Sequence, residues 1–488
     1  MANLNLIRVS MLRGAQTRSS IAVMALFALC ASHPRFANAA DICVRPGKAG
    51  CEQTIQQGVD AAFAGDTVTI HPGRYDENVV IGTGKDGLTI VGPKAILDGY
   101  FPNTGVALTV QSDDVTIERL TIRNGLANLV VAEANGLTLS RVTVEGSRDS
   151  CVEITGDNSS IFRSTFQHCA ASAVKVQGDN TRIIDSEALS VGNDAFDIEG
   201  DDTVAEGNKA RGLAGDGVQI EGDRSQVVRN HISYSDYAGV AINGFDSLVA
   251  HNVIRVVDSE GIDLRPPDSG AGLVGNAGEV LNNEIFSTHN DPCISVRGFP
   301  LFNAAEPAFD QVVVQNNNCR FALDGGIIAL STGAVTVENN VFRDSGNSPD
   351  EPCIRVLSEG AVIRGNSGSG CAAGGVWLQG SNGVVQDNTM KDNFGYGFMV
   401  GGGYEVGSPS EVIPTNSTTL SGNSATANVG FGFAIRGVSS GSELSGNKAA
   451  KNRESLCDAG TGTVASDNKF GTVFDSAGVG CVLVPFSN

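Results

Sequence analysis

A short pattern of alternating apolar and polar residues repeats along the middle of the chain. Its clearest copies are Cys-Val-Glu-Ile-Thr-Gly-Asp at 151–157, Ala-Val-Lys-Val-Gln-Gly-Asp at 173–179, Ala-Phe-Asp-Ile-Glu-Gly-Asp at 195–201 and Gly-Val-Gln-Ile-Glu-Gly-Asp at 217–223. The second apolar residue recurs every 22 residues, at positions 154, 176, 198, 220, 242 and 264. Less regular copies extend the series backwards through Val131, Val110, Ile90 and Ile70, and forwards through Val296, Leu330, Val356, Leu378, Val400 and Ile435.

Each copy predicts short strands joined by tight turns. Apolar residues alternate over two or three positions, and Gly, Asn or Asp marks both ends of the run. A copy has no room for a crossover helix. Such strands can bury their inward faces only when one coil stacks on the next. The sequence therefore predicts an all-β fold, a parallel β-helix with about 22 residues per coil.

Asparagines recur with nearly the same period. They are Asn208, Asn230 and Asn252, then Asn366 and Asn388, then Asn423, Asn447 and Asn468. Asn tolerates left-handed turn geometry, and its amide can bond to the equivalent residue of the next coil. We interpret these residues as a structural ladder rather than a functional site.

The N-terminal part of the chain resembles a known superfamily. Thr54-Ile55-Gln56, Gly65-Asp66-Thr67-Val68, Pro72-Gly73-Arg74-Tyr75 and Glu77-Asn78-Val79 are similar to the first segment of right-handed parallel β-helix proteins of the pectin-lyase-like superfamily. The resemblance implies a single-stranded right-handed β-helix with a capping helix at 54–63, coils at 64–470 and a C-terminal cap at 471–488. The superfamily includes lyases, hydrolases, esterases, epimerases and adhesins, so the fold does not give the function.

The first 39 residues predict a signal peptide. Arg8, Arg13 and Arg18 precede an apolar run at 21–31, and Ala37-Asn38-Ala39 is a small-residue cleavage site. The run is shorter than the ~20 residues that a membrane-spanning helix needs, so we expect no membrane anchor. The mature chain, residues 40–488, is then expected to be a secreted or periplasmic monomer.

Charge and cysteine content agree with this location. The formal charge is −21, with 33 Lys and Arg against 54 Asp and Glu, which argues against a nucleic-acid partner. An even number of cysteines in the mature chain predicts disulfides. Two pairs share one spacing relative to the repeat, which favours bridges between neighbouring cysteines: Cys43–Cys51, Cys151–Cys169, Cys293–Cys319, Cys353–Cys371 and Cys457–Cys481.

One outward-facing residue per copy forms a column along the predicted helix. The column is Glu153, Lys175, Asp197, Gln219, Ala241, Asp263, Ser295, Ala329, Arg355, Trp377, Met399 and Ala434. Long insertions follow Leu264, Val296 and Val400, and we expect them to wall a groove along this column. The expected substrate-binding residues are Glu153, Asp263, Arg265, Arg297, Arg355 and Trp377. The alternative is a solvated face with tolerated loops.

Asp194, Asp197 and Asp216 are the sharpest candidate site. Stacked carboxylates repel unless a proton or cation lies between them, and hard oxygen ligands suit Ca²⁺. The cluster is similar to the calcium site of family 9 pectate lyases, where the cation neutralises a uronate and a lysine removes the C5 proton. Ser172 and Gln219 depart from that pattern, and Lys175 is the expected base.

Two functions follow from these observations. The first is binding of an acidic polysaccharide bridged by calcium, with cleavage by β-elimination as a further step. Neighbouring carboxylates would raise the pKa of Lys175, which disfavours it as a base and ranks binding above cleavage. The alternative is a non-catalytic structural, surface or carbohydrate-binding protein.

Overall fold

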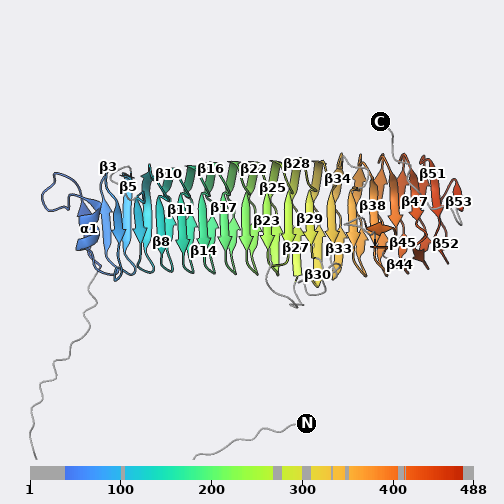
Figure 1. Cartoon of the computed structure of the whole chain (residues 1–488), viewed down its shortest axis with the longest axis horizontal. Coiled ribbons are helices and arrows are strands. Elements are labelled where there is room, and N and C mark those ends of the chain that lie inside the picture. The colour runs from blue at the N-terminus through green and yellow to red at the C-terminus, as the bar shows by residue number, and fades with distance from the viewer. Residues whose placement is uncertain are drawn as a thin grey trace, which may run out of the picture. The chain divides into compact units, whose positions relative to one another are not determined.

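The computed structural model describes residues 39–99, 105–267, 277–298, 309–330, 333–346, 351–404, 411–412 and 414–475. Within this part of the chain, strands stack coil upon coil from α1 to β53 (Figure 1). A regular coil has three strands, such as β11 (Val152–Thr155), β12 (Ser160–Phe162) and β13 (Thr165–Cys169). Each strand pairs in parallel with the equivalent strand of the next coil, so Val152 lies opposite Val174. The predicted β-helix is confirmed.

The first strands of successive coils form one continuous sheet, called the first sheet. Its inward residues stack in the core, because Val152, Val174, Phe196, Val218, Val240 and Ile262 are all fully buried. The strands are β4 (Val79–Ile81), β6 (Leu108–Val110), β8 (Val130–Glu133), β11, β14 (Val174–Gln177), β17 (Phe196–Glu199), β20 (Val218–Glu221), β23 (Val240–Asn243), β26 (Ile262–Arg265), β29 (Ile294–Arg297), β32 (Ile327–Leu330), β35 (Ile354–Leu357), β38 (Gly374–Gln379), β41 (Tyr396–Val400), β47 (Phe431–Ile435), β51 (Glu454–Asp458) and β53 (Val473–Asp475).

The second strands form the second sheet. They are β1 (Asp41–Val44), β2 (Thr67–Ile70), β5 (Thr89–Asp98), β7 (Thr116–Arg123), β9 (Thr138–Ser140), β12, β15 (Arg182–Ile184), β18 (Val204–Glu206), β21 (Gln226–Val228), β24 (Ser247–Ala250), β27 (Ala277–Leu281), β30 (Gln311–Gln315), β33 (Ala334–Glu338), β36 (Val362–Arg364), β39 (Val384–Gln386), β45 (Thr419–Ser421), β49 (Glu443–Ser445) and β52 (Val464–Ser466). The short pairs β42 (Gly403–Tyr404) with β43 (Glu411–Val412), and β44 (Thr415–Asn416) with β48 (Ser439–Ser440), lie outside the three sheets.

The third strands form the third sheet. The second halves of β5 and β7 also belong to this sheet. Its other strands are β3 (Gly73–Tyr75), β10 (Thr143–Ser147), β13, β16 (Glu187–Val191), β19 (Lys209–Leu213), β22 (His231–Ser235), β25 (Val253–Val257), β28 (Glu284–Thr288), β31 (Asn318–Ala322), β34 (Val341–Arg343), β37 (Ser367–Ser369), β40 (Thr389–Lys391), β46 (Ser424–Thr426) and β50 (Lys448–Ala450).

The register of the irregular coils differs from the prediction. Ile70 and Ile90 belong to the second sheet, not to the first column. Val131 points outward, because Val130 and Ala132 on either side of it are buried. In the N-terminal coils, the strands of the first sheet are β4 and β6.

A second register correction concerns β32. Ser295 lies opposite Ile328, so Ile328 and not Ala329 occupies the outward column. Ile327 and Ala329 are fully buried. The coil between β29 and β32 is longer than 22 residues, and the strand's own alternation sets which residue points outward.

The predicted capping helix is present as α1 (Ile55–Ala61). Thr54 is its N-cap and accepts a hydrogen bond from the backbone amide of Gln57 at 3.1 Å. Ile55, Val59 and Ala62 are buried in the core. Among the described residues, no helix is long and apolar enough to cross a membrane.

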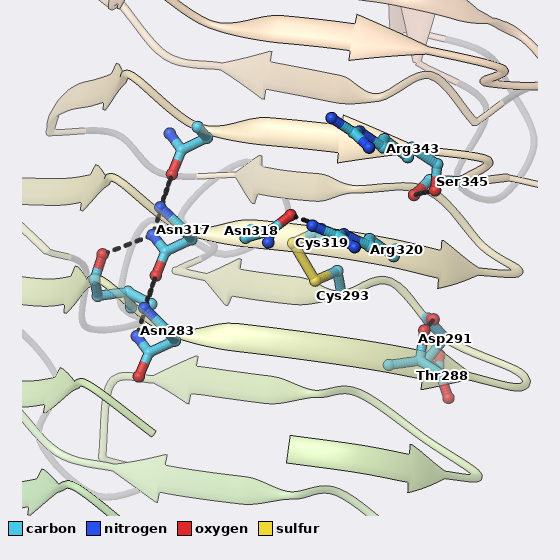
Figure 2. The surroundings of a disulfide bond; sticks show 12 residues. Asn283, Thr288, Asp291, Cys293, Asn317, Asn318, Cys319, Arg320, Arg343 and Ser345 are labelled. Atoms are coloured by element: carbon cyan, nitrogen blue, oxygen red, sulfur yellow. Dashed lines mark hydrogen bonds between the residues drawn. A yellow bond between two sulfur atoms is a disulfide. The ribbon is translucent and has the colours of Figure 1, made fainter. Parts of the chain in front are cut away.

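The asparagine ladder is longer than the sequence predicted. After Asn208, each side-chain amide oxygen in it accepts a hydrogen bond from the backbone N–H of the preceding ladder residue, as Asn317 does from Asn283 at 2.9 Å (Figure 2). Its Nδ2 donates to the carbonyl oxygen of Val280 at 2.8 Å and to Asn340 at 3.0 Å. Asn283, Asn317 and Asn340 join the predicted segments into one ladder from Asn208 to Asn468.

Replacing Asn317 by Ala is expected to destabilise the protein by about 2 to 4 kcal/mol, because the Asn283 amide loses its buried acceptor. Asn318→Ala is the matched control. Asn318 is only half-buried and accepts one bond, from Arg320 at 3.2 Å, so its loss should cost less than about 0.5 kcal/mol. Urea unfolding midpoints of the two variants test the difference, and equal shifts would contradict a structural role for the ladder.

Four of the predicted disulfides are confirmed: Cys43–Cys51, Cys151–Cys169, Cys293–Cys319 and Cys353–Cys371. Cys293 directly precedes β29 of the first sheet, and its disulfide links it to Cys319 on β31 of the third sheet (Figure 2). The fifth predicted pair includes Cys481, which lies outside the described residues. Residues 1–38 of the predicted signal peptide and most of the C-terminal cap at 471–488 also lie outside them, and β53 extends the first sheet past residue 470.

Candidate functional site

The outward face of the first sheet brings most of the predicted site residues together between β14 and β29. In register, Lys175 lies opposite Asp197, which lies opposite Gln219. Ala241 and Asp263 continue this column. Asp194 and Asp216 occupy the turns that precede β17 and β20, directly beside the column.

Lys175 is held between two carboxylates. Its Nζ lies 3.3 Å from Oδ2 of Asp197 and 3.4 Å from Oε1 of Glu199. Burial lowers the pKa of Lys175, but the charges of Asp197 and Glu199 outweigh burial, so the pKa is raised overall. Lys175 is therefore positively charged at neutral pH, and it serves poorly as a general base.

Asp194 and Asp216 form a short ladder of their own. Oδ1 of Asp194 accepts the backbone amide of Asp216 at 2.6 Å, and Oδ1 of Asp216 accepts that of Ala238 at 2.7 Å. Nδ2 of Asn193 donates to Oδ2 of Asp194 at 2.9 Å. Each carboxylate thus has one oxygen engaged with the next coil, which fixes its position.

Burial gives these carboxyl groups unusual proton affinity. It raises the pKa of Asp216 to about 7, with further increases from the charges of Asp194, Asp263 and Glu260 and an opposing effect of the Ala238 amide. Burial likewise raises the pKa of Asp194. Asp216 therefore exchanges a proton near neutral pH while it lies half-buried on the outward face.

Glu260 is a site residue that the sequence analysis missed. Backbone hydrogen bonds link the same turn position from coil to coil. The amide of Gly217, next to Asp216, donates to the Ala238 carbonyl, and the amide of Gly239, next to Ala238, donates to the Glu260 carbonyl. Glu260 therefore occupies the turn position of Asp216 two coils further on. Its position is 44 residues after Asp216, which is twice the repeat, so the periodicity could have revealed it.

Arg265 and Arg297 pair with the carboxylates at and next to Glu260. Arg297 pairs with Glu260 and Arg265 pairs with Asp263. Glu260 and Asp263 are each only 4% exposed as residues. Burial and then the charge of Glu260 raise the pKa of Asp263, and the two guanidinium groups oppose this rise.

Asp291 extends the carboxylate row by one coil, and the sequence analysis did not select it. The hydroxyl of Ser259 lies 2.6 Å from Oε2 of Glu260 and 3.0 Å from Oδ2 of Asp291. Burial, followed by the charge of Glu260, raises the pKa of Asp291. The carboxylate site comprises Asp194, Asp216, Glu260, Asp263 and Asp291.

A sequence profile described as "Right handed beta helix region" matches residues 104–254, 172–347 and 301–475. The chain belongs to the right-handed β-helix family. No curated protein sequence matches this β-helix protein.

Solved structures resemble this β-helix protein in fold. They include alginate lyase from Paenibacillus sp. str. FPU-7, at 14% identity over 63% of this chain and 99% of that chain, with a TM-score of 0.38. Pectate lyase Pel9A has 12% identity over 68% and 80%, with a TM-score of 0.36. The A-module of mannuronan C-5 epimerase AlgE6 from Azotobacter vinelandii has 18% identity over 84% and 94%, with a TM-score of 0.28. At these identities the likeness concerns the fold alone.

The remaining predicted binding residues lie away from the carboxylate site. Glu153 accepts a hydrogen bond from Asn128. The guanidinium of Arg355 stacks 4.4 Å above the ring of Trp377, whose indole N–H donates to the Gly401 carbonyl at 2.9 Å. Arg355 is on β35, three coils beyond β26, which corresponds to about 14 Å along the stack.

The calcium prediction concerns Asp194, Asp197 and Asp216. Among the described residues, no three His, Cys, Asp or Glu side chains lie close enough together to hold one metal ion. Asp197 is engaged with Lys175, and Asp194 and Asp216 each have one oxygen bonded to backbone. Calcium binding stays a prediction. The expected groove walls include 268–276, 299–308 and 405–410, which lie outside the described residues.

Proposed function

We propose that this β-helix protein binds an acidic polysaccharide along the outward face of the first sheet and hydrolyses it there. The observation that carries the proposal is the row of carboxyl groups from Asp194 to Asp291 on one face, in which Glu260 and Asp263 pair with Arg297 and Arg265. Glycoside hydrolysis needs two carboxyl groups, one carrying a proton and the other accepting one. The row supplies both kinds of group.

Asp216 is the proposed proton donor. Its pKa of about 7 lets it carry a proton near neutral pH, as a general acid must. In the proposed step the bond between the anomeric carbon and the bridging oxygen breaks, and that oxygen takes the proton of Asp216. Water adds to the anomeric carbon and gives its proton to a second carboxylate, either Glu260 or Asp263. β-Elimination would instead need an unprotonated base, and the positive charge on Lys175 disfavours that role.

The acidic substrate needs positive charge in the site. Arg265 and Arg297 are paired with carboxylates, yet about 44% and 37% of their side chains are exposed, so a uronate can approach both guanidinium groups from solvent. Ca²⁺ stays in the proposal only together with a bound uronate, because Asp194, Asp197 and Asp216 do not lie close enough together to hold the ion alone, and Asp216 cannot ligate it while it carries the catalytic proton. The disulfides fit a protein that acts in an oxidising compartment, and we propose export on that basis.

Incubation with polygalacturonate and with alginate, with and without Ca²⁺, tests the activity. We expect new reducing ends without the ultraviolet absorbance of a conjugated double bond. Appearance of that absorbance would assign elimination in place of hydrolysis. Binding without either product would assign a non-catalytic carbohydrate-binding role.

Calorimetry tests the metal separately. In the presence of polygalacturonate, we expect Ca²⁺ uptake that the double variant Asp194→Ala/Asp197→Ala loses. Because Asp216 binds a proton near pH 7, uptake should strengthen as the pH rises through that value. No uptake by the unaltered protein at pH 8 would remove calcium from the proposal and leave hydrolysis untouched.

A further inference from the structure

The third sheet carries a row of cationic and aromatic side chains that the sequence analysis did not select. One outward residue of each coil lies directly opposite that of the next coil, from Leu189 on β16 to Arg343 on β34. Between them lie Arg211, Ser233, Arg255, Phe286 and Arg320. Figure 2 shows Arg320 and Arg343 side by side on neighbouring coils. Together with Lys209, Tyr234 and Phe321 of the same strands, this row forms the basic–aromatic stripe, which stands out in a chain with a net charge of −21.

Part of the stripe is hollowed. A groove of about 650 Å³ is lined by residues of β16 to β28, among them Lys209, Arg211, His231, Tyr234, Arg255 and Phe286. Burial and then the charges of Arg255 and Lys209 lower the pKa of His231, which reflects a positive potential at this surface. Glu187 also lines the groove, where the cations outnumber it.

The cations of the stripe differ from those of the first sheet in their pairing. Among the described residues, Lys209, Arg211, Arg255, Arg320 and Arg343 form no ion pair within 4.0 Å. Most are exposed, with Arg320 half-buried. In contrast, Arg265 and Arg297 on the first sheet are engaged with carboxylates. The guanidinium groups of the stripe are therefore available to an anionic ligand.

Large aromatic rings are exposed between these cations. Tyr234 is 52% exposed, Phe286 40% and Phe321 46%. Phe286 and Phe321 meet edge to face with centroids 5.1 Å apart, and Arg211 lies 5.2 Å above the ring of Tyr234. Exposed rings of this size on a water-facing sheet are typical of a binding surface.

We propose that the basic–aromatic stripe is a second carbohydrate-binding surface, which holds a carboxylated polysaccharide. The guanidinium groups pair with uronate carboxylates, and the rings pack against the C–H faces of the sugars. The coil spacing of about 4.8 Å places successive contacts at intervals comparable to the length of a sugar residue. The stripe takes its ligand class from the proposed function, but it requires no catalysis on the first sheet.

A single-stranded nucleic acid also combines negative charge with stacking faces. The observations favour the polysaccharide. The disulfides indicate an oxidising compartment, and the overall charge of −21 opposes a ligand with the charge density of a nucleic acid.

The double variant Arg211→Gln/Arg255→Gln tests the stripe. Calorimetry with long polygalacturonate should show at least about tenfold weaker binding than the unaltered protein, since each replacement removes a charge-assisted hydrogen bond to a carboxylate. Tyr234→Ala should weaken binding as well. Arg229→Gln is the matched control, because Arg229 is exposed, pairs with Glu206 and lies outside the stripe. Binding should be unchanged in this control.

Three outcomes would overturn the proposal: no binding of polygalacturonate, equal binding by the double variant, or tighter binding of a single-stranded oligodeoxynucleotide. Cleavage of short oligogalacturonides reports separately on the first sheet, and the stripe variants should leave its rate unchanged. If no cleavage occurs in any variant, the proposed hydrolysis fails while the stripe result stands.

Discussion

Replacing Val227 by Lys is expected to unfold the β-helix, whereas replacing its neighbour Val228 by Lys should leave it folded. Both residues lie on β21, but Val227 is fully buried and Val228 faces outward. A lysine at 227 would place an unpaired charge in the core, between Ala205 and Val249 of the adjacent coils. Such a charge costs several kcal/mol, a large part of the roughly 5 to 15 kcal/mol that stabilise a typical domain.

Val228→Lys is a strict control because residue type, strand and new charge are the same. The added lysine lies opposite Glu206, so attraction rather than repulsion is expected. Circular dichroism and urea unfolding of both variants measure the difference. Two variants of similar stability would contradict the inward and outward assignment of the second sheet.

Asp216→Asn is expected to slow the proposed hydrolysis by a factor of about 10² to 10⁴ while it stabilises the fold at neutral and higher pH. Asn cannot release a proton as an acid catalyst does, and loss of such a group typically slows a reaction about 10² to 10⁴-fold. Its Oδ1 can still accept the amide of Ala238, as the ladder asparagines do, so the turn keeps its hydrogen bond. Opposite effects on activity and stability are typical of a functional group held in a costly environment.

The sign of the stability effect follows from the raised pKa. Aspartate in an unfolded chain has a pKa of about 3.9, and burial raises that of Asp216 to about 7. Between about pH 4 and 7 the folded protein keeps a proton that the unfolded chain has lost, so stability falls as the pH rises and levels off above 7. Removing this group should recover up to about 4 kcal/mol at pH 8, where Asp216 is ionised in both states.

Denaturant unfolding of the two proteins between pH 5 and 8 measures this slope, which the Asp216→Asn substitution should flatten. Asp197→Asn serves as the control. Asp197 is paired with Lys175, so its replacement removes an attraction and should bring no gain in stability. If Asp216→Asn is as active as the unaltered protein, Asp216 is not the proton donor. If it is no more stable at pH 8, burial does not raise the proton affinity of Asp216.

The 22-residue period determined most of the fold from sequence. A stack of equal coils repeats by translation, so residues one period apart become neighbours whatever the rest of the chain does. This is why the core stack, the asparagine ladder and the disulfides Cys151–Cys169 and Cys353–Cys371 could be predicted. The same rule places Glu260 in the turn column of Asp216, although it was overlooked.

The tertiary structure decided what the period does not contain. In coils longer than 22 residues, equivalent residues are no longer 22 positions apart. Only the structure therefore placed Asn283 and Asn317 in the ladder and Ile328 in the outward column. Ion pairing depends on side-chain directions within a face. The sequence therefore could not reveal that Arg265 and Arg297 are engaged, while Arg211 and Arg255 have no acidic partner among the described residues. Proton affinity depends on burial, and burial in a solenoid is set by what packs over each coil.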